Sequence, residues 1–160
     1  MSTTTKLTAG AISSWTAAFG TEINSLANGK AVLSSIDIDN STANDMWLNI
    51  NIQLSIASTT LTAGAICSVY PAWKNQDGTT YGDNQITTTP ATVSPGMQPA
   101  LIASPTITTV ATTKFAAMGR IPLLQGQILR LILYNGLLPS TALAASPGNV
   151  YVSTTNLTNA

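Results

Sequence analysis

The stretch Leu48-Asn-Ile-Asn-Ile-Gln-Leu-Ser-Ile56 decides the fold of this chain. Apolar and polar residues alternate strictly along it, which is typical of a β-strand that turns one face toward a core. A helix would spread the same apolar residues around its whole circumference. The polar side of the strand is uncharged, so it can meet either water or another polar protein surface.

Further strands are predicted on both sides of this stretch. Gln127–Tyr134 is the second strong one, because Leu129, Leu131 and Leu133 share a face. The other candidates are the segments Lys30–Ile38, Ala65–Tyr70 (ended by Pro71), Lys114–Met118 and Asn149–Thr154. Turn dipeptides such as Asn28-Gly29 separate them. Short strands between turn signals, without a convincing long helix, predict an all-β, two-sheet β-sandwich of jelly-roll-like type.

The chain is predicted to form one domain with loosely attached ends. Residues 1–28 are expected to be an extended N-terminal arm or irregular lead-in, residues 29–155 the β-sandwich domain, and residues 156–160 a polar tail. Four prolines between Pro90 and Pro105 exclude a central strand and predict a long Pro-rich loop. Such a loop either reaches a neighbouring molecule or crosses between the sheets in solvent.

The composition argues against catalytic activity. The chain has 160 residues, no histidine, one cysteine, six acidic and six basic residues, and only 8% of its residues are charged. Soluble domains carry roughly 25% charged residues, and acid–base catalysis draws on the residue types that are scarce here. We therefore expect no enzyme activity, no cofactor and no small-molecule substrate. Zero net charge and the lack of a long apolar run also predict neither a nucleic-acid partner nor a membrane.

One acidic cluster, formed by Asp37, Asp39, Asn40 and Asp45, has the oxygen ligands that calcium prefers. An EF-hand loop counted from Asp37 lacks the required glycine at its sixth position and the glutamate at its twelfth. The cluster is therefore predicted to be a turn-rich loop, with an irregular calcium site as the alternative.

The single cysteine, Cys67, is predicted to be a buried structural residue. It alternates with Val69 on a predicted strand, and no histidine exists to activate it.

Aromatic residues supply the candidate contact sites. Aromatic side chains dominate both cores and interfaces, and the three tryptophans could alternatively form a sugar-stacking platform beside Asn49 and Asn51. The candidate partner-interface residues are Trp15, Phe19, Trp47, Trp73 and Met97.

Several stretches, in this order and spacing, resemble a family of small bacteriophage virion proteins. They are Gly20–Gly29, Ala31–Ser35, Ile38–Thr42, Asn75–Asp83, Ile121-Pro-Leu, and Leu133-Tyr-Asn135 leading to Ala142–Ser146. The chain departs from the family pattern in two loops. A leucine stands where a second proline is common in Ile121–Gly126, and an extra proline occurs in Ser146-Pro-Gly-Asn149.

The resemblance implies a capsid decoration, or cement, protein. Proteins of this kind are β-sandwich trimers that bind the major capsid protein on the assembled head and clamp capsomers together. It also implies that the chain is made in the bacterial host cytoplasm and resides on the virion head surface. A tail, head-fibre or baseplate component, or a carbohydrate- or host-surface-binding β-sandwich, are the alternatives.

Overall fold

The computed structural model describes residues 7–9, 13–43, 45–57, 66–82, 86–92, 114–136 and 141–159. Within these ranges the regular structure is all β, with no helix, as the sequence predicts. The strands are β1 (Leu7–Ala9), β2 (Thr16–Ala17), β3 (Lys30–Leu33), β4 (Ile38–Asp39), β5 (Trp47–Ile56), β6 (Ile66–Trp73), β7 (Ala91–Thr92), β8 (Lys114–Pro122), β9 (Ile128–Gly136), β10 (Leu143–Thr155) and β11 (Leu157–Asn159).

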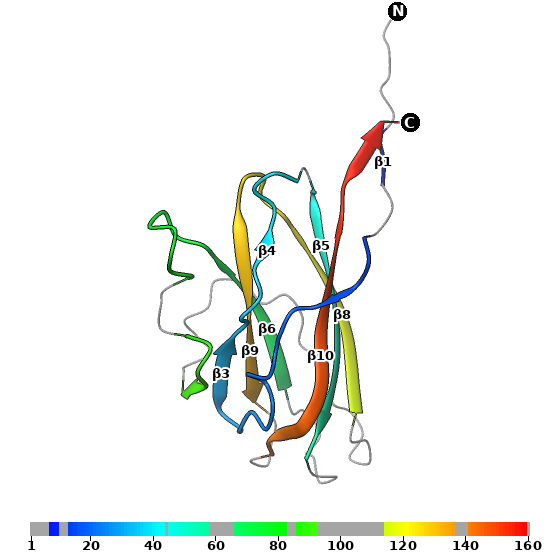
Figure 1. The fold of residues 1–160 in the computed structure, drawn as a ribbon. Coiled ribbons are helices and arrows are strands. Elements are labelled where there is room, and N and C mark those ends of the chain that lie inside the picture. Colours follow the sequence, from blue (N-terminus) through cyan, green and yellow to red (C-terminus); the bar gives the residue numbers. More distant parts are fainter. Residues whose placement is uncertain are drawn as a thin grey trace, which may run out of the picture.

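These strands form two antiparallel sheets that face each other as layers (Figure 1). The first, which we call the β5 sheet, has the order β2-β10-β5-β8. We call the second sheet the β9 sheet. Its central strand β9 pairs with β3 and β4 on one side and with β6 on the other. Strand β7 pairs with the other edge of β3. A third pairing joins β1 to β11 in a short ribbon that extends beyond the sandwich (Figure 1). The arrangement is consistent with a β-sandwich.

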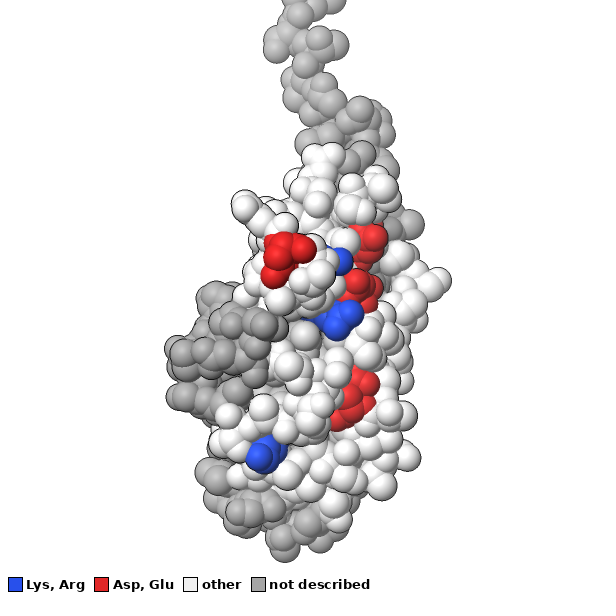
Figure 2. All heavy atoms as spheres, turned by 60° about the vertical axis from the view of Figure 1, so that its left-hand side comes forward, with Lys and Arg blue, Asp and Glu red and all other residues white. Residues whose placement is uncertain are grey.

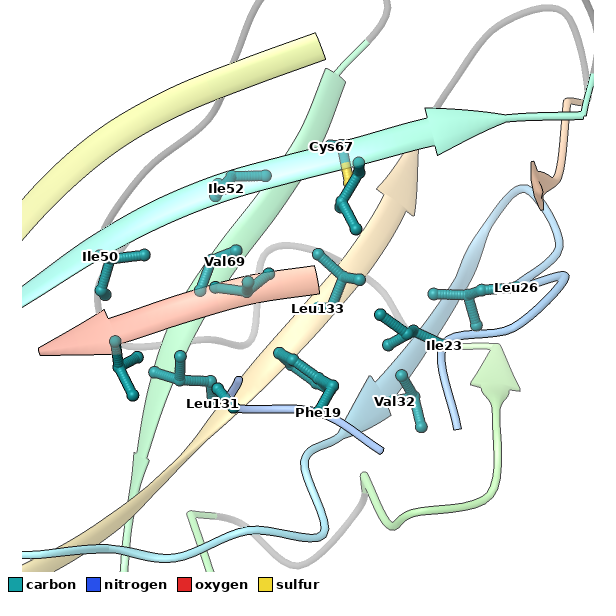
Figure 3. Packing of buried hydrophobic residues seen from close by; sticks show 14 of the residues in the cluster. Phe19, Ile23, Leu26, Val32, Ile50, Ile52, Cys67, Val69, Leu131 and Leu133 are labelled. Atoms are coloured by element: carbon teal, nitrogen blue, oxygen red, sulfur yellow. The ribbon is translucent and has the colours of Figure 1, made fainter. Parts of the chain in front are cut away.

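The main core lies between the two sheets. All five apolar residues predicted from the alternation of β5 are buried: Leu48, Ile50, Ile52, Leu54 and Ile56. Leu129, Leu131 and Leu133 of β9 meet them from the opposite layer, as the sequence also predicts (Figure 3). Each such side chain contributes about 1.5–3 kcal/mol of burial free energy. This facing pair of strands holds the sandwich together.

A second hydrophobic cluster covers the outer face of the β9 sheet. Its buried members are Ala31, Leu33, Tyr70, Ala72, Tyr81, Ile86 and Ile132. Tyr81 and Ile86 come from the segment after β6, which folds back over the sheet, and Tyr81 is bridged to Lys74. The β9 sheet is therefore covered by apolar side chains on both faces.

The N-terminal segment contributes to the main core. Phe19, Ile23 and Leu26 are buried there (Figure 3). The turn that carries them is tied to the body by Glu22, whose Oε1 accepts a hydrogen bond from the Ser35 backbone N–H at 2.7 Å. The predicted division into residues 1–28, 29–155 and 156–160 stays a prediction.

Strand β6 does not end at Pro71, where the sequence analysis placed its end. It continues to Trp73, and Pro71 pairs in register with Leu131. Among the described strands β6 pairs only with β9, and proline is tolerated on an edge strand because its missing N–H can lie on the unpaired side. The sequence pattern therefore predicted the strand correctly but placed its C-terminal end too early.

The predicted strand Lys30–Ile38 is in fact two strands, β3 and β4, with an irregular step between them. Ser34 makes this step. Its hydroxyl accepts a hydrogen bond from the Leu131 N–H and donates one to the Ile36 carbonyl. A serine hydroxyl that replaces ladder partners in this way interrupts the strand without leaving buried polar groups unpaired.

Candidate docking surface

The outer face of the β5 sheet differs from that of the β9 sheet because it is rich in uncharged polar groups. We call its outward residues the amide face. They are Asn49, Asn51, Gln53 and Ser55 of β5, Ala116, Met118 and Arg120 of β8, and Tyr151 of β10. The strand register places them in adjacent rows, with Asn51 between Met118 and Tyr151. Met118 is 73% exposed, the highest value among the large hydrophobic residues that the structure describes.

One end of the amide face is held rigidly by hydrogen bonds. Arg120 Nε donates to Asn49 Oδ1 at 2.7 Å, and Asn49 Nδ2 donates to Thr155 Oγ1 at 2.8 Å. The Arg120 guanidinium also lies 5.8 Å from the centre of the Trp47 ring, within range of a cation–π contact. These contacts bury Asn49, although it lies on the polar side of its strand. They fix the positions of the arginine and the tryptophan.

The other end of the face is hollowed into a groove of about 490 Å³. The register between β10 and β5 shifts there, because Leu143 pairs with Ile56 and the next pair is Gly148 with Leu54. Gly148 has a φ of 94°, and a Cβ on it would lie 2.3 Å from the Gln53 carbonyl oxygen. Only glycine allows this close approach. Gln53, Ser55, Ser146, Pro147 and Tyr151 are among the lining residues.

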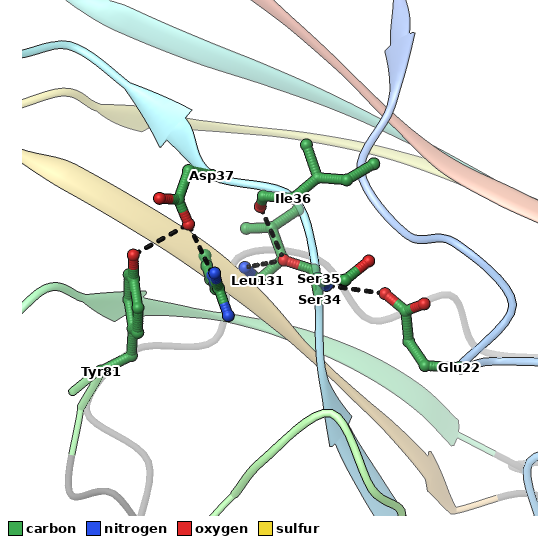
Figure 4. A network of polar contacts seen from close by, with 8 residues as sticks. Glu22, Ser34, Ser35, Ile36, Asp37, Tyr81 and Leu131 are labelled. Atoms are coloured by element: carbon green, nitrogen blue, oxygen red, sulfur yellow. Dashed lines mark hydrogen bonds and ion pairs between the residues drawn. The ribbon is translucent and has the colours of Figure 1, made fainter. Parts of the chain in front are cut away.

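The opposite side of the molecule carries acidic and basic side chains close together (Figure 2). Asp37 Oδ1 accepts hydrogen bonds from Arg130 Nε at 2.6 Å and from the Tyr81 hydroxyl at 2.8 Å (Figure 4). The Arg130 guanidinium lies 4.4 Å from the centre of the Tyr81 ring. These three residues fasten the segment after β6 to the β9 sheet.

The same contacts perturb the protonation of Asp37. Partial burial of its carboxylate would raise the pKa, but the hydrogen bonds from Arg130 and Tyr81 and the nearby positive charges outweigh burial and lower it. In the adjacent turn, hydrogen bonds from the Thr80 hydroxyl and from the backbone N–H groups of Thr79 and Thr80 lower the pKa of Asp77 to about 2. Both carboxylates are therefore ionised at neutral pH and structurally engaged.

The candidate interface residues fall in different environments. Trp15 is 39% exposed, and Trp47 is half-buried at the end of the amide face. Trp73 is half-buried and packs against the main core. Phe19 is only 2% exposed, and its ring fills the core between the sheets, so the single chain does not present it on its surface. Met97 lies outside the described residues, as does most of the Pro90–Pro105 segment.

Sequence reasoning missed Met118, Arg120 and Tyr151 as members of the exposed face. The signal in β8 is weak because its inward positions include Ala117 and Gly119, which blur the alternation. Tyr151 alternates with Val150 and Val152, which are buried, so its outward direction could have been inferred.

The acidic loop is organised by its own hydrogen bonds, as a turn-rich segment should be. Asp39 Oδ1 accepts a hydrogen bond from the Ser41 N–H. The buried Asn40 side chain donates to the carbonyls of Asp45 and Leu124. No group of three or more potential metal-ligating acidic or cysteine side chains occurs among the described residues.

The cysteine is buried, as predicted. Cys67 has no exposed surface and no disulfide partner. Desolvation by burial raises the pKa of its thiol to about 12, so the thiolate that would act as a nucleophile does not form at neutral pH.

Comparison with known proteins does not add an assignment, since no family model and no curated protein sequence matches the chain. Within the described ranges, no helix has the length and apolar character needed to cross a membrane.

Proposed function

We propose that this chain is a bacteriophage virion structural protein of the capsid decoration, or cement, type. In this proposal it binds the major capsid protein on the assembled head through the amide face. The observation that carries the proposal is the contrast between the two outer faces of the sandwich, since one is covered by the chain itself and the other presents amide, hydroxyl and thioether groups. The resemblance of seven stretches to small phage virion proteins supplies the identity of the partner.

The chemistry of the amide face suits attachment to a repeating protein lattice. In the described strands, the register positions along this face carry only two charged residues, Arg120 and Lys114, and no acidic residue. Docking therefore does not require removal of many charges from water, which is the costly part of burying a polar surface. Many weak contacts, repeated over a shell, add up through avidity. Binding only to the assembled shell stabilises that shell by mass action.

A homotrimeric assembly and a location on the virion head surface follow the resemblance. The pattern of strands and prolines supports the finer part of the proposed fold, a jelly-roll-like sandwich with an extended N-terminal arm and a long Pro-rich loop. Pairing of β1 with β11 brings the first and last described strands together at one end of the sandwich (Figure 1). We infer that this end reaches a neighbouring subunit, because a ribbon of three residue pairs has little stability of its own in water.

Quantitative mass spectrometry of purified particles tests the assignment. A decoration protein is expected in numbers comparable to the lattice sites of the head, whereas a tail, head-fibre or baseplate component is expected in few copies. Absence of the chain from purified particles would contradict the proposal altogether.

A pair of matched variants tests the proposed face. Gln53 and Gln76 are both exposed, but they lie on opposite sides of the molecule. Gln53→Arg would bury an uncompensated charge in the docked state, so occupancy of the shell should fall by about tenfold. Gln76→Arg should bind as the wild type does. Loss of binding by Gln76→Arg alone would place the docking surface on the other side.

A second candidate function, recognition of a carbohydrate on a host surface, is favoured by the groove. The groove places Tyr151 next to Gln53 and Ser55, and an aromatic face beside amide and hydroxyl groups suits a sugar ring. Isothermal titration calorimetry with a glycan panel should then show saturable binding that Tyr151→Ala abolishes. No saturable response to any glycan would rule out this function and leave the decoration proposal unaffected.

A further inference from the structure

The edges of the two sheets are protected unequally. An edge strand exposes unpaired backbone N–H and C=O groups that attract another strand, and natural proteins usually shorten or block such edges. Three of the edge strands, β2, β4 and β7, have two residues each. The long edge strand β6 contains Pro71. The remaining edge strand, β8, has nine residues, and it pairs only with β5 in the part of the chain that the structure describes.

The hydrogen-bonding pattern identifies which backbone groups of β8 face outward. The Leu123 N–H donates to the Met46 carbonyl at 2.8 Å, at the position where the β5–β8 register would continue. Hydrogen-bonded pairs alternate along an antiparallel ladder, so the odd-numbered residues of β8 bond to β5. The even-numbered residues, including Ala116, Met118 and Arg120, therefore direct their N–H and C=O groups away from the sheet.

The proline of β8 lies at a position where it removes no hydrogen bond to β5. Pro122 is an even-numbered residue at the last position of the strand, so its missing N–H lies on the outer edge. The donors at the middle of the edge are intact. Among the side chains of β8 that the structure describes, Met118 is the one large exposed hydrophobic, and it also lies at the middle of the strand.

We propose that β8 pairs with β8 of a second copy of this chain, antiparallel and centred on Met118, so that the two β5 sheets join into one continuous sheet. This inference goes beyond the proposed function and does not depend on it. A two-fold contact of this kind can coexist with a three-fold one in an assembly of dihedral symmetry.

The sequence of β8 fits this pairing better than the registers centred on Ala117 or on Arg120. Centring on Met118 pairs all nine residues, places Met118 against its symmetry mate, and sets Arg120 opposite the small Ala116. Centring on Arg120 would put two arginines directly opposite each other, and centring on Ala117 would put Lys114 opposite Arg120. Like charges in directly opposed positions destabilise a strand pair. The strand is thus complementary to itself about its own middle residue.

Disulfide trapping tests the register. In the proposed pair the two Met118 Cα atoms are about 5.5 Å apart, the distance of a hydrogen-bonded antiparallel pair and one that a disulfide spans without strain. Met118→Cys should therefore form a cross-linked dimer under mild oxidation. Ala116→Cys is the matched control, because four residues of offset along the strand, together with the spacing between strands, place the two Cα atoms about 14 Å apart. The native Cys67 is buried and should not contribute.

Sedimentation velocity over a range of concentrations tests the contact without a cross-link. Met118→Lys places two like charges opposite each other at the centre of the pair, so association through this edge should weaken by about tenfold. Met46→Lys is the matched control, since Met46 is also an exposed methionine but lies outside β8. Circular dichroism should show that both variants keep the wild-type fold.

The proposal is overturned by any of three results. The first is that Met118→Cys cross-links no faster than Ala116→Cys. The second is that Met118→Lys and Met46→Lys associate equally well, and the third is that the wild-type chain shows no two-fold association.

Discussion

The two sheets of this sandwich share one core, but their outer faces are covered differently. In β9, Leu131 faces the main core and its neighbour Ile132 faces the covering cluster, and both are buried. In β5, Leu54 is buried while its neighbour Gln53 is exposed. A sheet covered on both faces contributes stability, whereas a sheet covered on one face leaves a surface available for a partner. The difference separates the structural half of the molecule from the half that we propose to dock.

This contrast is visible in the residues of the two strands. Strand β5 alternates strictly, whereas β9 reads Ile-Leu-Arg-Leu-Ile-Leu-Tyr-Asn-Gly and is almost continuously apolar. Near-continuous apolar character is typical of strands buried on both faces. A comparison of the two strands therefore indicates which sheet has its outer face buried, although it does not identify the segment that buries it.

The largest expected effect comes from the core that both sheets share. Leu131→Ala should lower the free energy of unfolding by about 3 kcal/mol, because it removes burial and leaves a cavity between the sheets. Gln53→Ala, on the exposed side of β5, should change it by less than about 0.5 kcal/mol. Urea denaturation measures both. Similar losses for the two variants would mean that the β5 sheet is covered on its outer side as well.

A smaller effect is expected from the cover of the β9 sheet. Tyr81→Ala removes a buried ring, its hydrogen bond to Asp37 and its contact with Arg130, and should cost about 2 kcal/mol. Tyr151→Ala, on the amide face, should cost less than about 1 kcal/mol because its ring is only half-buried. Thermal unfolding compares the two. Equal shifts in Tm would contradict the assignment of Tyr81 to a structural cover.

The smallest expected effect is on the dependence of stability on pH. The folded-state pKa of Asp37 lies below its ordinary value of 3.8, so its contribution to stability is present above that value and is lost as pH falls through the lowered pKa. Asp37→Asn should therefore make the wild-type loss of stability between about pH 4 and pH 2 less steep. Part of the slope should remain, because the pKa of Asp77 is also lowered, to about 2.

Asp45→Asn is the matched control for this experiment, since Asp45 has no contact with Arg130 or Tyr81 among the described interactions. Urea denaturation at several acidic pH values gives the slope for each variant. An unchanged slope in Asp37→Asn would show that the contacts to Arg130 and Tyr81 do not distinguish the folded from the unfolded state.

The sequence was sufficient for the parts of the fold that depend on local pattern. The inward faces of β5 and β9 follow from alternation, and the burial of Cys67 follows from its place on a strand. The continuation of β6 through Pro71 depends on its position at a sheet edge, which is a property of the topology and not of the local sequence. The covering cluster also could not be predicted, because it joins Ala31, Tyr81 and Ile132 from distant parts of the chain.

The candidate site was predicted only in part, for a related reason. Trp47 does lie at the end of the amide face, but Phe19 lies in the core, and aromatic character alone does not distinguish the two environments. Met118 was missed because the alternation of β8 is blurred by alanine and glycine at its inward positions. The exposed face is defined by the register between strands, which single segments do not contain.

Hydrogen exchange of the chain, free and bound to purified phage heads, tests the central claim most directly. Protection on binding should increase around the shifted register of β10, and should stay unchanged in residues 74–82, which fold over the β9 sheet. Protection that appears in residues 74–82 while β10 exchanges as before would contradict the claim that the uncovered face is the docking face.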